Sequence, residues 1–457
     1  MAETKEYDVV ILGGGSGGYA TALRAGQLGM SVALIEADKV GGTCLHYGCI
    51  PAKALLHAAE VADEMREGPS IGVMGTFNGM DMVALNAFKD GVIGKMFKGL
   101  QGLLKGRHVE IVNGWGTLVA RDTIQVNGVN YKGKHVVLAS GSYSKTIGQQ
   151  ITSRVITSTE ALSLTQVPSS AIVLGGGVIG VEFASTWKSY GADVQIIEGL
   201  PHLVANEDID ISKNLERQFK KRGIKFATST MFDHVEETAT GVRVFTQDGK
   251  EYDADILLIA VGRGPRTKDL GYEQQGITMD RGFVLTDERL RTNVEGIYAV
   301  GDIVPGPQLA HRGFLQGVFV AEDIAGLNPR VINPDYIPRV TFCRPEIASV
   351  GITQAQAEEK FGKANVETAK FNLAGNGKSQ MLGADGFVKL VRQKDGPIVG
   401  FHAIGARMGE QIGEGETMVA WEAFPEDYNG LIHAHPTQNE ALGEAAMALA
   451  GKPLHSN

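Results

Sequence analysis

The segment Tyr7-Asp8-Val9-Val10-Ile11-Leu12-Gly13-Gly14-Gly15-Ser16-Gly17-Gly18 decides the fold. Its first half is a nearly continuous apolar run, which is typical of a parallel strand buried on both faces. Its second half is a glycine cluster that opens a helical stretch, and a second apolar strand, residues 32–35, then ends at Glu36. The order strand, glycine turn, helix, strand and acid predicts an α/β unit with a parallel sheet.

The chain repeats this pattern farther on. Residues 171–174 run into Gly175-Gly176-Gly177-Val178-Ile179-Gly180, a helical stretch extends to Tyr190, and residues 194–197 end at Glu198. The last glycine and the acid are 18 residues apart in both copies, from Gly18 to Glu36 and from Gly180 to Glu198. One glycine string is a weak signal, but two matched copies favour two dinucleotide sites over an unrelated glycine-rich turn.

Each glycine of such a motif has a physical task. The first allows a tight turn, the second lets the backbone approach a pyrophosphate, and the third allows close packing of helix on strand. The N-terminus of the helix then faces the phosphates, and the acid accepts hydrogen bonds from a ribose diol. The loop 199–203 after Glu198 contains no arginine to neutralise a 2′-phosphate. We therefore expect the second site to prefer NAD over NADP, with a solvated strand-end acid as the alternative interpretation of Glu198.

Cys44 and Cys49 are two of only three cysteines in the chain. A close pair in a chain otherwise nearly free of cysteine suggests redox chemistry. Five residues of regular helix rise about 7.5 Å, whereas a disulfide needs Cα atoms about 4.4–6.8 Å apart. If the pair is bonded, the helix that carries it should be irregular, and Gly48 is well placed to relieve it. Two reduced buried cysteines or a metal half-site are the alternatives, and Cys343 is expected to be a packed core thiol.

Size and charge limit the remaining possibilities. The 457 residues allow about three domains. The net charge of −9 argues against broad binding to nucleic acid or anionic membranes. The N-terminal residues contain no apolar signal-peptide region, and the most apolar stretch, residues 171–181, is too short to span a bilayer. We expect a cytoplasmic protein, where a disulfide is more often catalytic than structural.

Six motifs stand out along the chain. They are residues 41–53 around the cysteines, 175–182, Glu198, 261–265, Gly301-Asp302 with Leu309-Ala310-His311, and the run His433-Ala434-His435-Pro436-Thr437-Gln438-Asn439-Glu440. Together they resemble the motifs of the flavin-dependent pyridine nucleotide–disulfide oxidoreductases. The resemblance runs from about residue 6 to the C-terminus, in the order of that family. Within the family, the chain most resembles the members that oxidise dihydrolipoamide.

The resemblance implies an α/β architecture of two doubly wound dinucleotide-binding domains, for FAD and NAD, and a C-terminal α+β dimerisation domain. The expected boundaries are 1–149 for the FAD domain, 150–273 for the NAD domain, 274–344 for a central domain that completes the FAD site, and 345–457 for the dimer interface. Residues 142–148 are expected to be a crossover linker.

The resemblance also implies where two cofactors bind, with no metal. The FAD site would comprise Gly13, Gly15, Gly18, Glu36, Gly42, Thr43, Lys53, Gly116, Ser140, Gly141, Asp302, Gln308, Leu309, Ala310 and His311. The NAD site would comprise Gly175, Gly177, Gly180, Glu182, Glu198 and Gly262.

The catalytic roles implied by the resemblance agree with the residue types. Cys49 would be the thiol beside the flavin, and Cys44 the one that exchanges with substrate, since only a thiolate attacks a disulfide sulfur. His435, from the other subunit of a homodimer, would hold the proton, and Glu440 would orient its ring. Lys53 and Glu182 are each a charged residue in an otherwise apolar segment, so we expect them to form an ion pair near the flavin, with a solvated Lys53 as the alternative. Without the resemblance, a zinc half-site or a satisfied core histidine competes for residues 433–435.

The implied activity is oxidation of protein-bound dihydrolipoamide to lipoamide with NAD⁺ as acceptor. The implied partners are lipoyl domains and the acyltransferase core of 2-oxo acid dehydrogenase complexes. Glutathione reductases that use NADPH are one alternative, although arginines are expected after their second strand acid. Mercuric reductases carry a C-terminal cysteine pair that residues 451–457 lack. A non-catalytic assembly subunit is a further alternative.

His46 and Tyr47 stand between the cysteines where Asn-Val is common, and we expect these larger side chains to narrow the surroundings of the disulfide.

Overall fold

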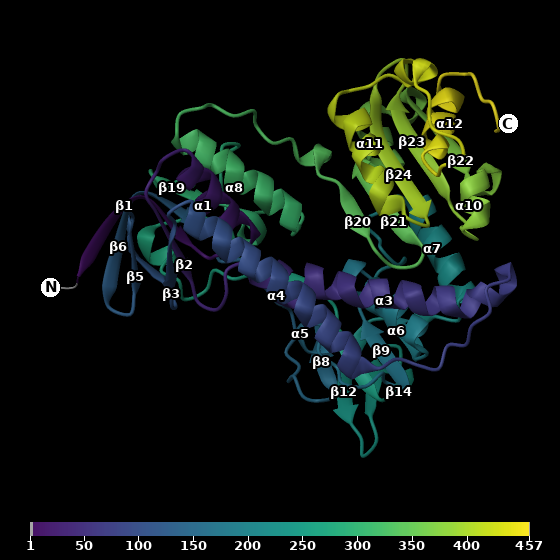
Figure 1. The fold of residues 1–457 in the computed structure, drawn as a ribbon, viewed down its shortest axis with the longest axis horizontal. Helices are drawn as coiled ribbons and strands as arrows, with labels where there is room; N and C mark the ends of the chain where they lie inside the picture. Colours follow the sequence, from purple (N-terminus) through teal and green to yellow (C-terminus); the bar gives the residue numbers. More distant parts are fainter. Residues whose placement is uncertain (1–2, 457) are drawn as a thin grey trace.

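The first apolar run forms β1 (Thr4–Leu12), the strand around which the first sheet is built in this computed structural model, which describes residues 3–456 (Figure 1). Val9 and Ile11 pack into one core, and Val10 and Leu12 pack into another. Because successive strand residues point to opposite faces, a sheet covered on both sides needs an unbroken apolar run. The strand starts at Thr4, earlier than the predicted Tyr7.

The first sheet has seven strands and a parallel centre. Its order is β3-β2-β1-β6-β5-β4, and β19 pairs with β6 from a distant part of the chain. β1, β2, β3, β6 and β19 are parallel, whereas β4 and β5 are antiparallel additions at one edge. The other strands are β2 (Val32–Glu36), β3 (Glu110–Asn113), β4 (Thr117–Ala120), β5 (Thr123–Val126), β6 (Val129–Leu138) and β19 (Ile297–Ala299).

The second glycine motif lies in a second sheet, which is fully parallel and has the order β11-β10-β9-β15-β8. Its strands and the motif helix, which ends at Tyr190 as predicted, confirm the internal repeat. The elements are β8 (Val155–Thr157), β9 (Ser170–Leu174), α6 (Val178–Tyr190), β10 (Asp193–Ile197), β11 (Lys225–Ala227) and β15 (Ile256–Ile259), with a small antiparallel sheet of β12 (Phe232–Glu237), β13 (Val242–Thr246) and β14 (Glu251–Ala254).

Two short strands connect these sheets. β7 (Ser142–Ser144) lies in the predicted linker and pairs antiparallel with β16 (Arg263–Pro265). The chain therefore leaves the first sheet after β6 and returns toward it after β15 along a two-stranded ribbon. A further small hairpin, β17 (Met279–Asp280) and β18 (Phe283–Val284), precedes β19.

The C-terminal sheet is antiparallel, in the order β20-β21-β24-β23-β22. Its first strand ends at Thr341, so this sheet begins before the expected boundary at 345. Pro345 lies in the turn between β20 and β21, and the change of pattern seen there in the sequence marks that turn. The strands are β20 (Arg339–Thr341), β21 (Glu346–Gly351), β22 (Val366–Asn372), β23 (Phe387–Gln393) and β24 (Ile398–Gly405).

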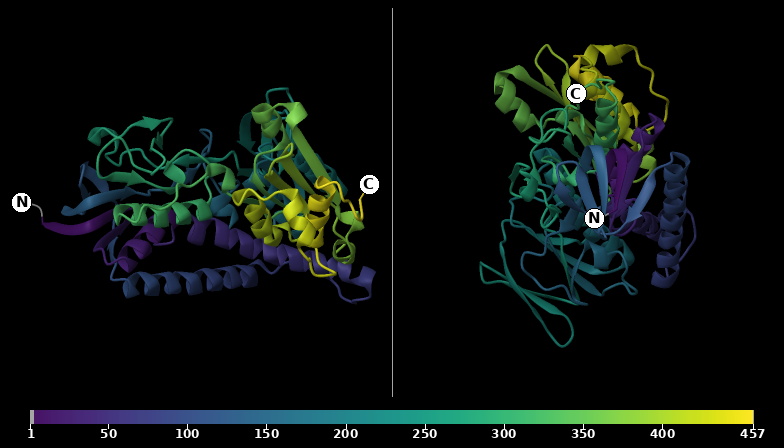
Figure 2. Two further views of the ribbon diagram at one scale, coloured as in Figure 1. Left: turned by 90° about the horizontal axis from the view of Figure 1, so that it is seen from above. Right: turned by 90° about the vertical axis from the view of Figure 1, so that its left-hand side faces the viewer.

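Helices cover the sheets. α1 (Ser16–Gln27) packs closely on α8 (Ala310–Ile324), where a Cβ atom at Gly317 would lie 2.4 Å from the Gly17 carbonyl oxygen. Two long helices, α3 and α4, run along one side of the molecule (Figure 2). The remaining helices are α2 (Gly42–Tyr47), α3 (Cys49–Glu67), α4 (Met82–Gly106), α5 (Ser158–Ala161), α7 (Ile209–Lys221), α9 (Gln354–Phe361), α10 (Gly377–Met381), α11 (Met408–Ala420) and α12 (Glu440–Leu449).

Candidate active site

The two glycine loops have the same geometry. Gly13 and Gly175 both have a φ of +107°, in the region that disfavours L side chains. A Cβ atom at Gly18 would lie 1.8 Å from the Gly13 carbonyl oxygen, and one at Gly180 would lie 1.9 Å from that of Gly175. The first and third glycines are therefore required by the turn and by helix packing.

The middle glycine of each motif faces open space. A Cβ atom at Gly15 or Gly177 would meet nothing within 4 Å. These glycines are the N-caps of α1 and α6, and neither helix start has a side-chain cap. The first-turn N–H groups are therefore free to bind an anion, which is the environment that a pyrophosphate requires.

An acid closes each loop. Glu36 accepts a hydrogen bond from the Gly14 N–H at 2.7 Å, and Glu198 accepts one from the Gly176 N–H at 2.5 Å. Their second oxygens accept from the N–H groups of Asp38 and Leu200, respectively. Both carboxylates are fixed at a strand end beside the open glycine. The remaining lone pairs of each carboxylate can accept ribose hydroxyl groups.

The cysteine segment lies directly against the first glycine loop. The Gly41 N–H donates to the Gly14 carbonyl oxygen at 2.8 Å, and a Cβ atom at Gly42 would lie 2.7 Å from the Gly15 Cα. Thr43 follows in the first turn of α2. A ligand bound at the first-turn N–H groups of α1 would therefore also reach the segment that carries Cys44.

Gly48 separates the helices that carry the two cysteines. Cys44 lies on α2, which ends at Tyr47, and Cys49 is the first residue of α3. Gly48 has φ −151° and ψ −106°, outside the helical region. This break confirms the prediction that the segment is irregular between Cys44 and Cys49.

Both cysteines are present as half-buried thiols in this structure. The hydrogen bond between them lowers the pKa of Cys49, and the Lys53 ammonium lowers it further against the effect of burial. The same hydrogen bond, together with burial, raises the pKa of Cys44. The arrangement therefore favours a thiolate on Cys49 with the remaining proton on Cys44. Cys49 also occupies the N-terminus of a helix, a position that stabilises thiolates.

Lys53 and Glu182 form the predicted ion pair. Lys53 lies one turn after Cys49 on α3, and its Nζ is 2.8 Å from Oε2 of Glu182 on α6. The Glu182 side chain is buried, and the Phe342 ring lies 4.7 Å from the Lys53 Nζ. The pair joins the cysteine helix to the helix of the second glycine motif.

Other residues expected at the first nucleotide lie at one edge of the first sheet. Gly13 follows β1, Ser140-Gly141 follows β6, and Asp302 follows β19, and all three strands are parallel. Asp302 accepts a hydrogen bond from Ser142 Oγ at 2.5 Å, and Gln308 donates to its carbonyl oxygen. Leu309, Ala310 and His311 begin α8, and Gly116 lies just before β4.

The second set collects at the equivalent edge of the second sheet. Gly175 follows β9, Glu198 follows β10, and Gly262 follows β15 with a φ of +100°. The carboxyl ends of adjacent parallel strands are where α/β sheets bind ligands. The strand-end residues expected at each nucleotide site thus lie at the carboxyl ends of two equivalent sheets.

His435 and Glu440 are paired. His435 Nδ1 lies 2.9 Å from Glu440 Oε1, and the other oxygen accepts from the Thr437 N–H. Burial favours the neutral acid, but the Thr437 N–H and His435 hold the pKa of Glu440 below its usual value. The His435 side chain is 79% exposed. Figure 1 shows α12, which begins at Glu440, well apart from α3, which begins at Cys49.

His433 pairs with an acidic side chain of α11. Its Nε2 lies 2.9 Å from Glu414 Oε1. Within residues 3–456, no group of three or more histidine, cysteine or acidic side chains is arranged to hold a metal ion. Cys343 is buried, as predicted, with 1% exposure.

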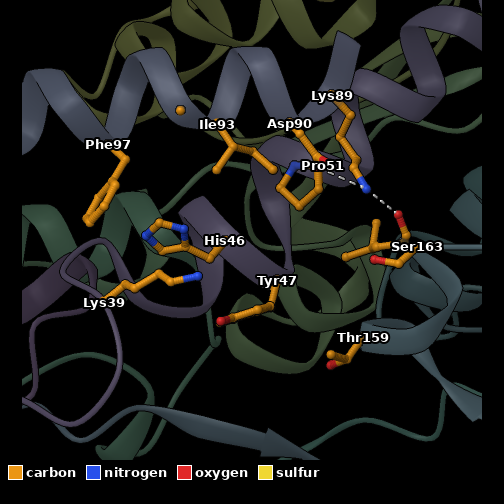
Figure 3. A pocket seen from close by; sticks show the side chains of 12 residues that line it. Lys39, His46, Tyr47, Pro51, Lys89, Asp90, Ile93, Phe97, Thr159 and Ser163 are labelled. Carbon is orange, nitrogen blue, oxygen red and sulfur yellow. Dashed lines mark hydrogen bonds and ion pairs between the residues drawn. The ribbon is translucent and has the colours of Figure 1, made fainter. Parts of the chain in front are cut away.

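His46 and Tyr47 lie in a cavity of about 360 Å³ between α2, α4 and α5 (Figure 3). The His46 ring packs edge-on against Phe97 of α4 and bonds to the Val40 carbonyl oxygen, while the Tyr47 hydroxyl donates to Asp38. Neither cysteine lines this cavity. The His46 ring therefore fills space toward α4, and the expectation that these larger side chains narrow the surroundings of the disulfide stays a prediction.

Sequence reasoning missed three supporting residues, Ser142, Arg263 and Phe342. Arg263 donates to Ser142, the residue that bonds Asp302, and the Phe342 N–H donates to Glu182 at 2.9 Å. These contacts join segments more than 100 residues apart, so no local spacing could reveal them.

Among the described residues, no helix is both long and apolar enough to cross a membrane.

Comparisons with known proteins agree with this geometry. Residues 7–317 match the family model described as pyridine nucleotide-disulphide oxidoreductase, and residues 337–446 match its dimerisation domain. Dihydrolipoyl dehydrogenase of Bacillus subtilis (strain 168) is 37% identical, over 98% of this chain and 99% of the relative. The protein of that name from Geobacillus stearothermophilus is 38% identical, over 98% of this chain and 97% of the relative.

The fold is also similar to a solved structure. LpdA from Mycobacterium tuberculosis superposes with a TM-score of 0.90 at 26% identity, over 98% of this chain and 99% of that chain.

Proposed function

The chain belongs to the pyridine nucleotide-disulphide oxidoreductase family, and we propose that it oxidises dihydrolipoamide to lipoamide with NAD⁺ as the final acceptor. Members of the family use FAD and a pyridine nucleotide. The observation that carries the proposal is the position of the two thiols. The helix is interrupted at Gly48 between Cys44 and Cys49, and the segment that carries Cys44 lies against the first glycine loop.

The residues present fit both cofactors. The open middle glycine, uncapped helix start and fixed acid occur twice, at Gly15 with Glu36 and at Gly177 with Glu198. We assign the first set to FAD, since it touches the cysteine segment, and the second to NAD. When bound, the flavin accepts the electron pair of a dithiol and passes it to the nicotinamide as hydride.

The two cysteines carry out the first half-reaction, in which the substrate dithiol is oxidised. A substrate thiolate attacks Sγ of Cys44 in the disulfide form, the Cys44–Cys49 bond breaks, and Cys49 leaves as a thiolate. The second substrate thiol then displaces Cys44 and closes the lipoamide ring. Two thiols are oxidised and one disulfide is reduced, so electrons balance. The lowered pKa of Cys49 suits a leaving group, and the raised pKa of Cys44 suits the thiol that keeps a proton.

The proton of the substrate thiol goes to His435 Nε2. The Glu440 carboxylate holds Nδ1, which fixes the tautomer with Nε2 free to accept and stabilises the imidazolium. His435 is exposed and separate from the cysteine helix within one chain, so we place it at the thiols of the partner subunit. The match to a dimerisation domain over residues 337–446 supports this arrangement.

The proposed partners follow from the substrate. Dihydrolipoamide is carried on lipoyl domains, so this chain would serve the acyltransferase core of a 2-oxo acid dehydrogenase complex, in the cytoplasm. Its acidic net charge of −9 supports neither nucleic acid nor anionic membranes as partners.

The test compares two substrate pairs on the purified holoenzyme. Dihydrolipoamide with NAD⁺ should turn over at least about a hundredfold faster than glutathione disulfide with NADPH. Faster turnover of glutathione disulfide would overturn the proposal. Cys44→Ser should abolish turnover while leaving FAD bound and the dimer intact, and retained turnover would remove Cys44 from the reaction.

A further inference from the structure

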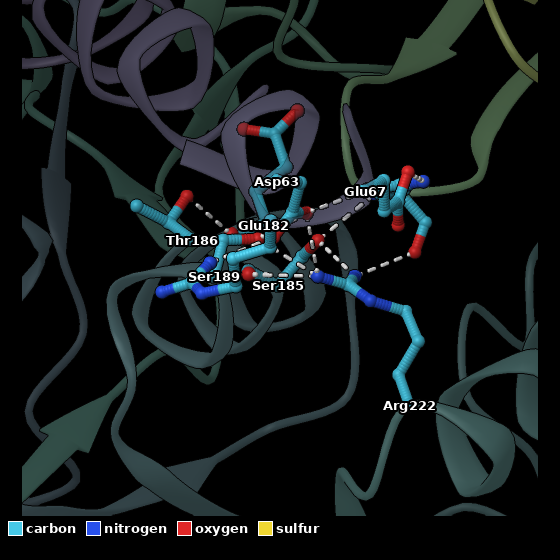
Figure 4. Close-up of polar contacts among 9 residues, drawn as sticks. Asp63, Glu67, Glu182, Ser185, Thr186, Ser189 and Arg222 are labelled. Carbon is cyan, nitrogen blue, oxygen red and sulfur yellow. Dashed lines mark hydrogen bonds and ion pairs between the residues drawn. The ribbon is translucent and has the colours of Figure 1, made fainter. Parts of the chain in front are cut away.

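A buried polar cluster continues from Glu182 along α6 (Figure 4). Ser185 and Ser189 follow Glu182 at spacings that place all three on one face of the helix. Both serine side chains are nearly fully buried, at 2% and 3% exposure. This cluster lies outside the thiols, the glycine loops and the His435 pair described above.

Arg222 is the centre of the cluster. It caps the C-terminus of α7, and its Nη1 donates to Ser185 Oγ and to the Arg344 carbonyl oxygen, both at 2.8 Å. Its Nη2 donates to Ser189 Oγ at 2.8 Å and lies 3.4 Å from Asp63 on the cysteine helix. One planar guanidinium thus bridges α3, α6 and the loop before β21, a geometry that a lysine cannot reproduce.

The loop 342–344, which Arg222 holds, also contacts the Lys53–Glu182 ion pair. The Arg344 N–H donates to Ser185 Oγ at 2.9 Å, so this residue is held at both its N–H and its carbonyl oxygen. Two residues earlier, the Phe342 N–H donates to Glu182 Oε1 at 2.9 Å and the Phe342 ring covers the Lys53 ammonium. Any shift of residues 342–344 therefore moves a contact of both Lys53 and Glu182.

We propose that Arg222, acting through Ser185 and the loop 342–344, is a positioning residue that holds the Lys53–Glu182 pair in the place where it sets the reactivity of the Cys49 thiol. The guanidinium contacts Ser185 and Arg344, and the loop contacts Glu182 and Lys53. Lys53 then acts on the thiol one helical turn before it through its charge. The inference rests on the proposed role of Cys49 but not on the identity of the substrate.

The charges around Cys49 make its thiol a sensitive reporter. Cys44 and Lys53 stabilise the thiolate, Glu182 opposes it, and Arg263 is a further cation nearby. Because Lys53 and Glu182 act in opposite directions, a displacement of one relative to the other changes their combined effect. Loss of the Phe342 contact frees Lys53 to turn toward solvent, since its side chain is already 34% exposed.

The experiment uses two substitutions that preserve charge. Arg222→Lys keeps the cation but loses the bridging geometry, and Ser185→Ala removes only a hydroxyl group. Arg217→Lys is the matched control, because Arg217 lies on the same helix and makes an exposed ion pair with Asp385. In each dithiol-form holoenzyme, the rate of iodoacetamide alkylation of Cys49 is measured from pH 5 to 9, with the site identified by peptide mass.

Both variants should alkylate Cys49 about threefold to tenfold more slowly at pH 7 than wild type, with the pH profile displaced to higher pH. Arg217→Lys should match wild type in rate and profile. Unchanged alkylation profiles in Arg222→Lys and Ser185→Ala, with only a lower melting temperature, would overturn the proposal and leave the cluster as a structural brace. Since no substrate is present, a wrong substrate assignment would appear in turnover and not in this assay.

Discussion

The Lys53 ammonium contacts both oxygens of the Glu182 carboxylate, at 3.0 and 2.8 Å, across the junction of the cysteine helix and the helix of the second glycine motif. The pair connects the two halves of the proposed electron path. The thiol stands one turn away on one side, and the nucleotide loop begins the helix on the other. The geometry therefore ties the reactivity of the thiol to the relative position of the two sheets.

Lys53→Met should reduce the alkylation rate of Cys49 at pH 7 by about tenfold, because one nearby cation that lowers the thiol pKa is lost. Lys53→Arg keeps the charge and should retain most of the rate. Equal rates in the Met variant and wild type would show that Lys53 does not support the thiolate.

Two glycines of the first loop should affect different properties, Gly15 the binding of FAD and Gly18 the stability of the fold. Gly15→Ala places a methyl group where only a ligand would be, so the protein should fold with wild-type stability and lose FAD. Gly18→Ala drives a methyl group into the Gly13 carbonyl and should cost about 3 kcal/mol of unfolding free energy. Urea unfolding of the apoprotein and flavin content measure the two effects. A stable Gly18→Ala protein, or a Gly15→Ala protein that retains FAD, would contradict this assignment.

The second loop predicts the nucleotide preference. Glu198→Gln retains an acceptor for the Gly176 N–H but removes the charge that repels a 2′-phosphate. KM for NAD⁺ should rise about tenfold, the loss of a charge-assisted hydrogen bond, while the NADP⁺ to NAD⁺ activity ratio increases. Steady-state kinetics with both nucleotides provide the measurement. Glu36→Gln is the control, since it should weaken FAD retention without altering this ratio.

The His433–Glu414 pair predicts a pH-dependent stability. The Glu414 hydrogen bond raises the pKa of His433. Burial opposes ionisation of Glu414, yet His433 and Asn439 lower the pKa of that carboxyl. The histidine contributes stability below its unfolded pKa and loses it as pH rises through the folded value. The glutamate contributes above its unfolded pKa and loses it as pH falls.

Both contributions are therefore present between the ordinary pKa values of the two groups, around pH 5.5. His433→Gln should cost about 1 kcal/mol of unfolding free energy at pH 5.5 and less at pH 8.5. Urea unfolding at the two pH values checks the sign. A larger cost at pH 8.5 would show that the pair does not stabilise the charged histidine.

The local motifs were predictable because they obey short-range rules. The strand–glycine–helix–acid repeat, the break at Gly48 and the burial of Cys343 all follow from dihedral preference, packing or spacing within a segment. The Lys53–Glu182 pair was predicted from two charged residues in otherwise apolar segments, although its members are 129 residues apart.

Other features depend on tertiary packing that no local pattern contains. Pro345 suggested a domain boundary but lies in a turn between β20 and β21 of one sheet. His46 packs against Phe97 of α4, whose position is set by long-range packing. Arg222 gives no local signal, since a basic residue at a helix C-terminus is ordinary and only the fold brings it to Ser185 and Arg344.

Anaerobic titration of the holoenzyme with dihydrolipoamide tests the central claim most directly. If Cys49 is the thiolate beside the flavin, two electrons per FAD should produce a long-wavelength thiolate–flavin absorption band, and Cys44→Ser should prevent dihydrolipoamide from generating it. Complete bleaching of the flavin without that band, or no reduction by dihydrolipoamide at all, would contradict the account.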